Sequence, residues 1–386
     1  MNNFAFHVPT DIRFGKGQIQ CLPTELAKLG ESVLLVYGGG SIKRNGIYSS
    51  IRSMLEKFTV YELPGIEPNP KIASVRKGVA LCKKYKIDIV LAVGGGSCID
   101  AAKNIACGAY YDGDPWDLVI DHSKVTKALP IIVVLTIAAT GSEMDNAAVI
   151  SNPITNEKLE LNAPNLYPML SICDPTYLFT LPAKQTAAGT VDIMSHAFEQ
   201  YFQSNDEAYL TDCFAEGVLK TCIKYGPIAL RQPDNYEARS NLMWASSMAL
   251  NHLLTVGKGG AWSCHPMEHE LSAYYDITHG VGLAILTPAW MKYVLNNKTV
   301  ARFAMYAKNI WGIEDSNEFA AAKRGIEKTI EFFKSLDMPT KLSEVGITSE
   351  NFAKMAAEAV RVSGIAKRSY CLLGEEDIVK IYLSCL

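Results

Sequence analysis

Two apolar segments of this 386-residue chain run into the same four residues, and that repetition limits the available folds more than any other feature. Residues 33–37 are followed by Gly38, Gly39, Gly40 and Ser41, and residues 87–93 by Gly94, Gly95, Gly96 and Ser97. Each apolar run has the length of a buried strand, and an amphipathic stretch follows each turn. Strands that alternate with helices in this way predict a parallel sheet covered by helices.

The sheet is expected to bind a ligand at one edge. Residues 133–136 predict a third strand, which leads to a turn of small residues at 139–143, while residues 42–57 and 72–85 predict helices. Ligands of open parallel sheets bind outside the carboxyl ends of the strands, where amides at helix starts attract phosphate. Three such turns indicate a dinucleotide, although a tight turn needs glycine whether or not anything binds there.

The first turn also bears on which dinucleotide is bound. A carboxylate at this place would bond the ribose hydroxyl of NAD and repel the extra phosphate of NADP. No Asp or Glu lies between Tyr37 and Tyr48, and Lys43 and Arg44 follow the turn instead. Their charges favour NADP(H) through charge-assisted hydrogen bonds, with a solvated helix start as the alternative.

The second half of the chain has a different pattern. Long helical stretches dominate after Thr180, and they are predicted at residues 185–202, 208–225, 237–253 and 319–336. We therefore expect an α/β dinucleotide-binding domain at residues 1–180 and an all-helical metal-binding and substrate domain at residues 181–386.

Five of the seven histidines fall between residues 192 and 279, which indicates a catalytic metal site. Asp192 and His196 are four residues apart, so one helical face can aim both at a single point. His265 precedes a proline that suits a helix start, and Gly280 and Gly282 after His279 suggest a helix stop. One further helix and its ends would then supply the remaining ligands. Spacing leaves open whether His269 or His279 is one of them, and each histidine taken alone could equally be a packed or surface side chain.

Composition excludes several classes of protein. Hydrophobic residues make up 48% and charged residues 20%, which is ordinary for a globular protein, and the net charge of -3 offers no basic face to a nucleic acid. No apolar run is long enough to span a bilayer, and no leader precedes the fold, so we expect a cytoplasmic protein with no membrane partner. The ten cysteines show no metal-binding spacing and are expected to be reduced.

Taken together, these motifs resemble the iron-containing (group III) alcohol dehydrogenase family, and within it the NADPH-dependent butanol dehydrogenase and aldehyde reductase branch. Residues 9–17 are similar to the opening strand and turn of that family. Residues 94–103 are similar to its cofactor signature, and residues 139–143 to the motif that follows. The resemblance covers nearly the whole chain.

The resemblance implies a set of site residues. The metal ligands would be Asp192, His196, His265 and His279, while His269 would be a nearby catalytic histidine that does not bind the metal. The cofactor contacts would be Gly38, Gly39, Gly40, Ser41, Gly95, Gly96, Ser97, Asp100, Thr136, Ser142, Asp145, Lys158 and Thr180. The glycine run at 38–41 would replace the aspartate of NAD-preferring relatives. Asp145 departs from the family, which often has asparagine there, so it either contacts a ribose hydroxyl or marks a local change of register.

The implied reaction is hydride transfer between NADP(H), or possibly NAD(H), and a primary alcohol or aldehyde, with iron or zinc as Lewis acid on the substrate oxygen. His269 would relay a proton or orient a neighbouring group. The family also implies a homodimer. The alternatives are a dehydroquinate synthase-like lyase, which would release phosphate, a hydroxyacid-oxoacid transhydrogenase, and a nucleotide-binding regulatory subunit with a structural metal.

Overall fold

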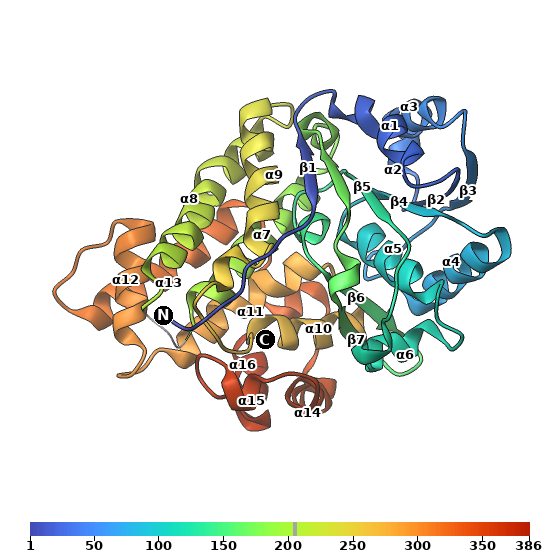
Figure 1. Ribbon diagram of the computed structural model, residues 1–386. Coiled ribbons are helices and arrows are strands. Elements are labelled where there is room, and N and C mark those ends of the chain that lie inside the picture. Colours follow the sequence, from blue (N-terminus) through green and yellow to red (C-terminus); the bar gives the residue numbers. More distant parts are fainter. Residues whose placement is uncertain (204–206) are drawn as a thin grey trace. The chain divides into compact units, whose positions relative to one another are not determined.

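The structure is a computed structural model, and it describes residues 1–203 and 207–386. Contacts divide the chain into two compact units, and neither unit is one continuous stretch of sequence. The sheet unit comprises His7–Pro182 and Gln232–Asn251, and the helical unit comprises Met1–Phe6, Ala183–Arg231 and His252–Leu386. Figure 1 labels most of the α-helices and strands of the two units.

The sheet unit contains six parallel strands in the order β1-β8-β5-β4-β2-β3. The strands are β1 Asp11–Phe14, β2 Ser32–Tyr37, β3 Thr59–Leu63, β4 Ile89–Gly94, β5 Ile131–Leu135 and β8 Leu170–Cys173. The predicted parallel sheet is confirmed, and the three strands expected from sequence are β2, β4 and β5, within two residues at each end. A separate antiparallel pair, β6 Ala147–Asn152 with β7 Glu157–Asn162, was not predicted.

The sheet is buried on both faces, which explains why its strands are continuous apolar runs. Alternate residues of a strand point to opposite faces. In β2, Leu34 and Val36 join a core with α4 and α5, whereas Val33 and Leu35 join a second core on the other face. All four side chains are fully buried.

The α-helices of the sheet unit are α1 Leu22–Ala27, α2 Ser41–Arg44, α3 Ile47–Met54, α4 Ile72–Tyr85, α5 Gly96–Gly108, α6 Pro115–Ile120 and α9 Tyr236–Leu250. Its 3-10 helices are η1 Gln18–Cys21, η2 His122–Lys124, η3 Ser142–Met144, η4 Pro164–Leu166 and η5 Pro175–Leu178. The prediction for α4 is confirmed at both ends. The single helix predicted at 42–57 is wrong, because Gly46 has a φ of 83° and separates α2 from α3.

The helical unit is built from α7 Ala183–Tyr201, α8 Tyr209–Arg231, α10 Cys264–Tyr275, α11 His279–Val294, α12 Val300–Trp311, α13 Glu318–Ser335, α14 Phe352–Val362, α15 Ile365–Arg368 and α16 Glu375–Ser384. Its 3-10 helices are η6 Leu253–Thr255, η7 Leu342–Val345 and η8 Ser349–Asn351. Helix α7 packs against α8 and α11, and α10 packs against α11 and α14. The all-helical character predicted for this half is confirmed in the described residues.

The expected helix stop after His279 is wrong. His279 is the first residue of α11, and Gly280 and Gly282 lie inside that helix. A Cβ on Gly280 would overlap the backbone carbonyl of Ala188 in α7, so the glycine is required by close packing between the two helices. The histidines after residue 260 therefore come from two helices and not from one.

Two further expectations concern chemistry and environment. All ten cysteines are free thiols. Among the helices of the described residues, none combines the length and apolar composition needed to cross a membrane.

Candidate metal centre

Helix α7 supplies two polar side chains that point to one place. Asp192 and His196 are one turn apart and are each 3% exposed. Asp192 Oδ1 lies 3.5 Å from His196 Nδ1. The helical spacing seen in the sequence therefore does bring a carboxylate oxygen and a ring nitrogen together.

Helices α10 and α11 bring two more imidazoles to this pair. His265 is the second residue of α10, and its ring centroid is 4.7 Å from that of His196 and 5.2 Å from that of His279. His279 Nε2 lies 3.6 Å from Asp192 Oδ1. One ligand atom from each of the four residues lies within 4.8 Å of the others.

These distances fit a shared divalent ion. Two ligands that each lie about 2.1 Å from a tetrahedral ion are about 3.4 Å apart, close to the 3.5 Å and 3.6 Å separations from Asp192 Oδ1. His265 Nε2 and His196 Nδ1 are buried, and neither has a hydrogen-bond partner among the described residues. A buried ring nitrogen without a partner is costly unless something else occupies its lone pair.

The protonation of the cluster also suits a metal. Burial, with help from the neighbouring imidazoles of His265 and His279, holds the pKa of His196 well below its usual range. His196 is therefore neutral at physiological pH, which is the form that binds metals.

His269 lies beside the cluster and not within it. It is half-buried on α10, and its ring centroid is 6.3 Å from that of His265 and 5.6 Å from that of His279. The group that includes Asp192 contains His279, whereas His269 forms a second group with Glu268 and His279. The packing of α11 on α7 thus brings His279, and not His269, into the group that contains Asp192.

Two carboxylates near the cluster were missed from sequence. Glu199 on α7 and Glu268 on α10 are buried, and each contacts Nδ1 of a cluster histidine, His265 and His279 respectively. A signal did exist for Glu199, because it stands three residues after His196 and seven after Asp192, on the same helical face. Glu268 carried no comparable signal.

The predicted cofactor residues of the sheet unit gather at one edge. Gly38 to Ser41 follow β2, Gly95 to Ser97 link β4 to α5, and Thr136 directly follows β5. Because β4 lies between β2 and β5, the three turns are neighbours at the carboxyl ends of the strands.

The glycines of the two repeated turns have different packing. A Cβ on Gly95 would lie 2.9 Å from Ile137 Cβ, and one on Gly96 would lie 3.0 Å from Thr140 Cβ, so these glycines are needed for the turns to pack together. A Cβ on Gly39 would meet nothing within 4 Å, and Gly39 is exposed. Packing does not explain why residue 39 is a glycine. The backbone of Gly39 is accessible at the end of β2.

Three predicted cofactor residues take part in an internal polar network. Lys103 Nζ donates to Ser142 Oγ at 3.0 Å and to Asp145 Oδ1 at 2.6 Å, and Ser142 Oγ donates to Asp100 Oδ1 at 2.6 Å. Burial raises the pKa of Asp100 to about 6. Asp145 is 2% exposed and forms an ion pair with Lys103, so its carboxylate has little surface to offer a ribose hydroxyl.

The last two predicted cofactor residues lie outside this network. Lys158 is buried in β7. Thr180 is exposed, and its Oγ1 lies 3.4 Å from the side-chain amide of Asn45.

A carboxylate lies near the first glycine turn, although none is present there in sequence. Glu62 of β3 accepts hydrogen bonds from the hydroxyls of Tyr37 and Tyr48, each at 2.7 Å. Lys43 Nζ lies over the same two rings, at 5.2 Å and 4.6 Å from their centroids. Both oxygens of Glu62 therefore have partners, and a lysine stands close to them.

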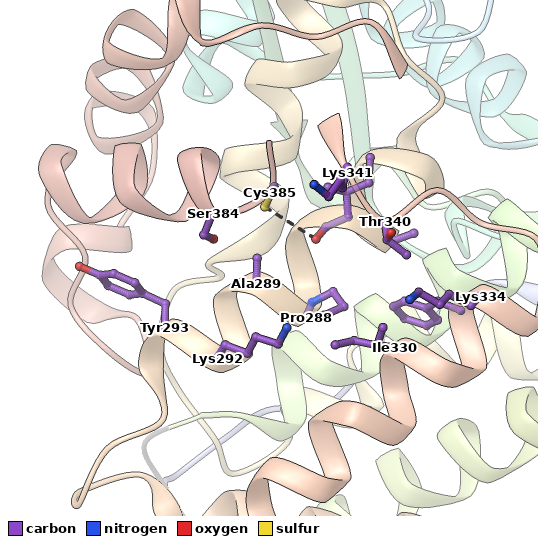
Figure 2. Close-up of a pocket in the computed structure, with 13 residues that line it drawn as sticks. Pro288, Ala289, Lys292, Tyr293, Ile330, Lys334, Thr340, Lys341, Ser384 and Cys385 are labelled. Carbon is purple, nitrogen blue, oxygen red and sulfur yellow. Dashed lines mark hydrogen bonds between the residues drawn. The ribbon is translucent and has the colours of Figure 1, made fainter. Parts of the chain in front are cut away.

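A cavity of about 420 Å³ lies elsewhere in the helical unit (Figure 2). It is lined by Ala284, Ile285, Pro288, Ala289, Lys292, Tyr293, Ile330, Phe333, Lys334, Thr340, Lys341, Ser384 and Cys385. None of the four clustered residues lines it, so it is separate from the candidate metal centre.

The chain is similar to known proteins along nearly its whole length. Residues 9–175 match the family described as iron-containing alcohol dehydrogenase, and residues 186–386 match the C-terminal region of the Fe-containing alcohol dehydrogenase family. NADH-dependent butanol dehydrogenase A of Clostridium acetobutylicum is 54% identical over 99% of both chains. NADPH-dependent aldehyde reductase YqhD of Escherichia coli is 40% identical over 90% of both chains.

A solved structure of a butanol dehydrogenase is also similar to this chain. A crystal structure of NADH-dependent butanol dehydrogenase A from Thermotoga maritima superposes with a TM-score of 0.95 and 42% identity, covering 100% of this chain and 99% of the other.

Proposed function

Because the chain belongs to the iron-containing alcohol dehydrogenase family, we propose that it interconverts an aldehyde and a primary alcohol by hydride transfer with NADP(H) and one divalent metal ion. The resemblance noted in the sequence, including its butanol dehydrogenase and aldehyde reductase branch, is thereby confirmed. The observation that carries the proposal is the convergence of Asp192, His196, His265 and His279.

These four residues would hold the metal. The ion, when bound, supplies a Lewis acid for the substrate oxygen. Three neutral imidazoles and one carboxylate leave a divalent ion with a net charge of plus one, so its attraction for oxygen is retained. Four protein ligands fill a tetrahedral zinc site, whereas iron accepts more ligands, so the ligand number favours iron.

The three turns of the sheet unit would hold the dinucleotide. Gly39 and the first turn of α5 present backbone amides, which are suited to phosphate oxygens. We infer NADP(H) because the turn after β2 has no carboxylate of its own, and Lys43 lies beside it. Both oxygens of the nearby Glu62 already accept hydrogen bonds from tyrosine hydroxyls. The relatives are named for both cofactors, NADH for the 54% identical dehydrogenase and NADPH for the 40% identical reductase. A direct comparison of the two cofactors is therefore the decisive measurement.

His269 is our proposed catalytic histidine. It lies one turn from His265 on α10 and is half-buried, so its ring can exchange a proton with solvent. The competing role is to orient a neighbouring group by a hydrogen bond.

We also propose that the protein is a homodimer, because the family resemblance implies one. Light scattering of the purified protein measures its oligomeric state directly.

The test combines metal analysis with an oxidation assay. Purified protein is expected to contain about one iron or zinc per chain and to oxidise NADPH faster than NADH with small aldehydes. His265→Ala should lose both the metal and the activity. His122→Ala is the matched control, because His122 lies in the sheet unit, where Nε2 bonds the carbonyl of Glu160. Metal-loaded wild-type protein that oxidises neither cofactor with any aldehyde would contradict the proposal.

Two further measurements separate the rival functions. Phosphate release from a sugar phosphate would indicate the dehydroquinate synthase-like lyase. A nicotinamide that is retained through turnover would indicate the transhydrogenase.

A further inference from the structure

Each of the two buried carboxylates beside the cluster contacts Nδ1 of one of its histidines. Glu199 is 4% exposed and Glu268 is fully buried. An ionised carboxylate can only accept hydrogen bonds, so a ring nitrogen bonded to an ionised carboxylate must carry the proton.

Glu199 contacts His265 through both backbone and ring. Its Oε1 accepts from the backbone N–H of His265 at 2.8 Å and lies 3.1 Å from His265 Nδ1. Its Oε2 accepts from the backbone N–H of Ser263 at 2.7 Å. The carboxylate thus caps the start of α10, which has no cap from its own N-cap side chain, and it fixes the ring at the same time.

The ring of His265 then has only one orientation that satisfies its contacts. With Nδ1 as the donor to Glu199, Nε2 is the atom with a free lone pair. This Nε2 is buried and has no hydrogen-bond partner among the described residues. It is the atom available to a metal.

Glu268 makes the equivalent contact with His279. Its Oε2 bonds His279 Nδ1, and the other ring nitrogen, Nε2, lies 3.6 Å from Asp192 Oδ1. Space for this carboxylate depends on Gly282, where a Cβ would lie 2.7 Å from Glu268 Cγ and 3.0 Å from its Oε1. The position of Glu268 therefore depends on the close packing between α10 and α11 at Gly282.

We propose that Glu199 and Glu268 are positioning residues, which hold the Nδ1–H tautomers of His265 and His279 so that both Nε2 atoms face the metal. The inference rests on the proposed function. A carboxylate behind a ligating imidazole fixes the ring direction and raises its basicity.

One competing arrangement gives Glu268 a different role. Glu268, His269 and His279 also lie within 4.8 Å of one another through one ligand atom each, as a second metal position would require. The two arrangements differ in metal stoichiometry, because positioning by Glu268 needs one ion per chain and ligation by Glu268 needs two.

The experiment measures Co²⁺ binding by metal-free wild-type protein and by Glu199→Gln and Glu268→Gln. The matched control is Glu216→Gln, since Glu216 is a buried carboxylate of the helical unit that bonds Tyr201 and Asn309 and touches no cluster histidine. We expect one Co²⁺ per wild-type chain, roughly 10-fold to 100-fold weaker binding with an altered Co²⁺ absorption spectrum in both test variants, and no change of either in the control.

Each other outcome has a fixed meaning. Wild-type affinity and spectrum in both test variants would overturn the inference while leaving the proposed function standing. A wild-type chain that binds no Co²⁺ would overturn the proposed function itself. Two Co²⁺ per wild-type chain and one in Glu268→Gln would make Glu268 a ligand. Nitrogen NMR of ¹⁵N-histidine-labelled, zinc-loaded wild-type protein needs no variant, and metal bonded to Nδ1 of His265 or His279 would also refute the inference.

Discussion

At Gly280, α11 lies close against the backbone of α7, and Gly280→Ala tests whether that contact sets the metal geometry. The added Cβ would overlap the carbonyl oxygen of Ala188 and would lie 2.8 Å from its carbonyl carbon. Both of the contacted atoms belong to the backbone, so no side chain can rotate away. The two helices must separate.

The size of the separation can be worked out from contact distances. Carbon atoms pack at about 3.5 to 4.0 Å, so α11 must move by about 1 Å, at a cost of about 1–3 kcal/mol. His279 precedes Gly280 directly, and Asp192 is one turn beyond Ala188. Their 3.6 Å separation would grow towards about 4.6 Å, whereas two ligands of one ion at about 2.1 Å cannot be more than about 4.2 Å apart.

The expected result is a folded protein with a weakened metal site. We expect Gly280→Ala to keep the helical circular dichroism of the metal-free wild type and to bind metal at least about 10-fold more weakly. Gly217→Ala is the matched control, because Gly217 is an exposed position inside α8 with nothing within 4 Å of an added Cβ. That control should keep wild-type metal affinity and gain roughly 0.5–1 kcal/mol of stability. Wild-type metal affinity in Gly280→Ala would refute the reasoning.

Three further predictions test other parts of the site. Gly39→Asp should shift preference from NADPH towards NADH by at least about 10-fold, measured as the ratio of kcat/KM values, because a carboxylate there bonds the ribose hydroxyl and repels the extra phosphate; an unchanged ratio would place the adenosine elsewhere. His269→Ala should lower kcat while the metal content stays at the wild-type level, and loss of the metal would instead make His269 a ligand. Burial raises the pKa of Glu143 to about 7 from an unfolded value of 4.5, so the folded state binds the extra proton and stability is lost as pH rises through about 7. The loss amounts to about 3 kcal/mol, and urea unfolding of Glu143→Gln at pH 5 and pH 8 should show a smaller difference than wild type.

The sheet was largely predictable because its signals are local. A buried parallel strand is a short apolar run wherever it occurs, and β2 and β4 each end at a glycine turn that the sequence displays. The break between α2 and α3 was misjudged because an apolar period continues across Gly46, and only the backbone conformation there ends the helix. Helix α9 shows a different limit, since its residues predict a helix but not the unit in which it packs.

The candidate site was predictable where its residues lie close together in the sequence, and not where they lie far apart. The Asp192 and His196 pair follows from spacing within one helix, and the same spacing would have found Glu199. Asp145 was expected at the cofactor, but the buried charge of Lys103, 42 positions earlier in the sequence, engages its carboxylate. No local pattern reveals such a partner.

The choice between His269 and His279 indicates how a small residue that is not itself a ligand can determine which histidine joins the cluster. His269 shares a helix with His265 and looked as suitable as His279 in the sequence. Only the docking of α11 on α7 puts His279 Nε2 3.6 Å from Asp192 Oδ1, and that docking requires the bare backbone of Gly280 against Ala188. If the contact selects the ligand, then a substitution that opens it should weaken metal binding even though it changes no ligand, and His269 should be unable to take the place of His279.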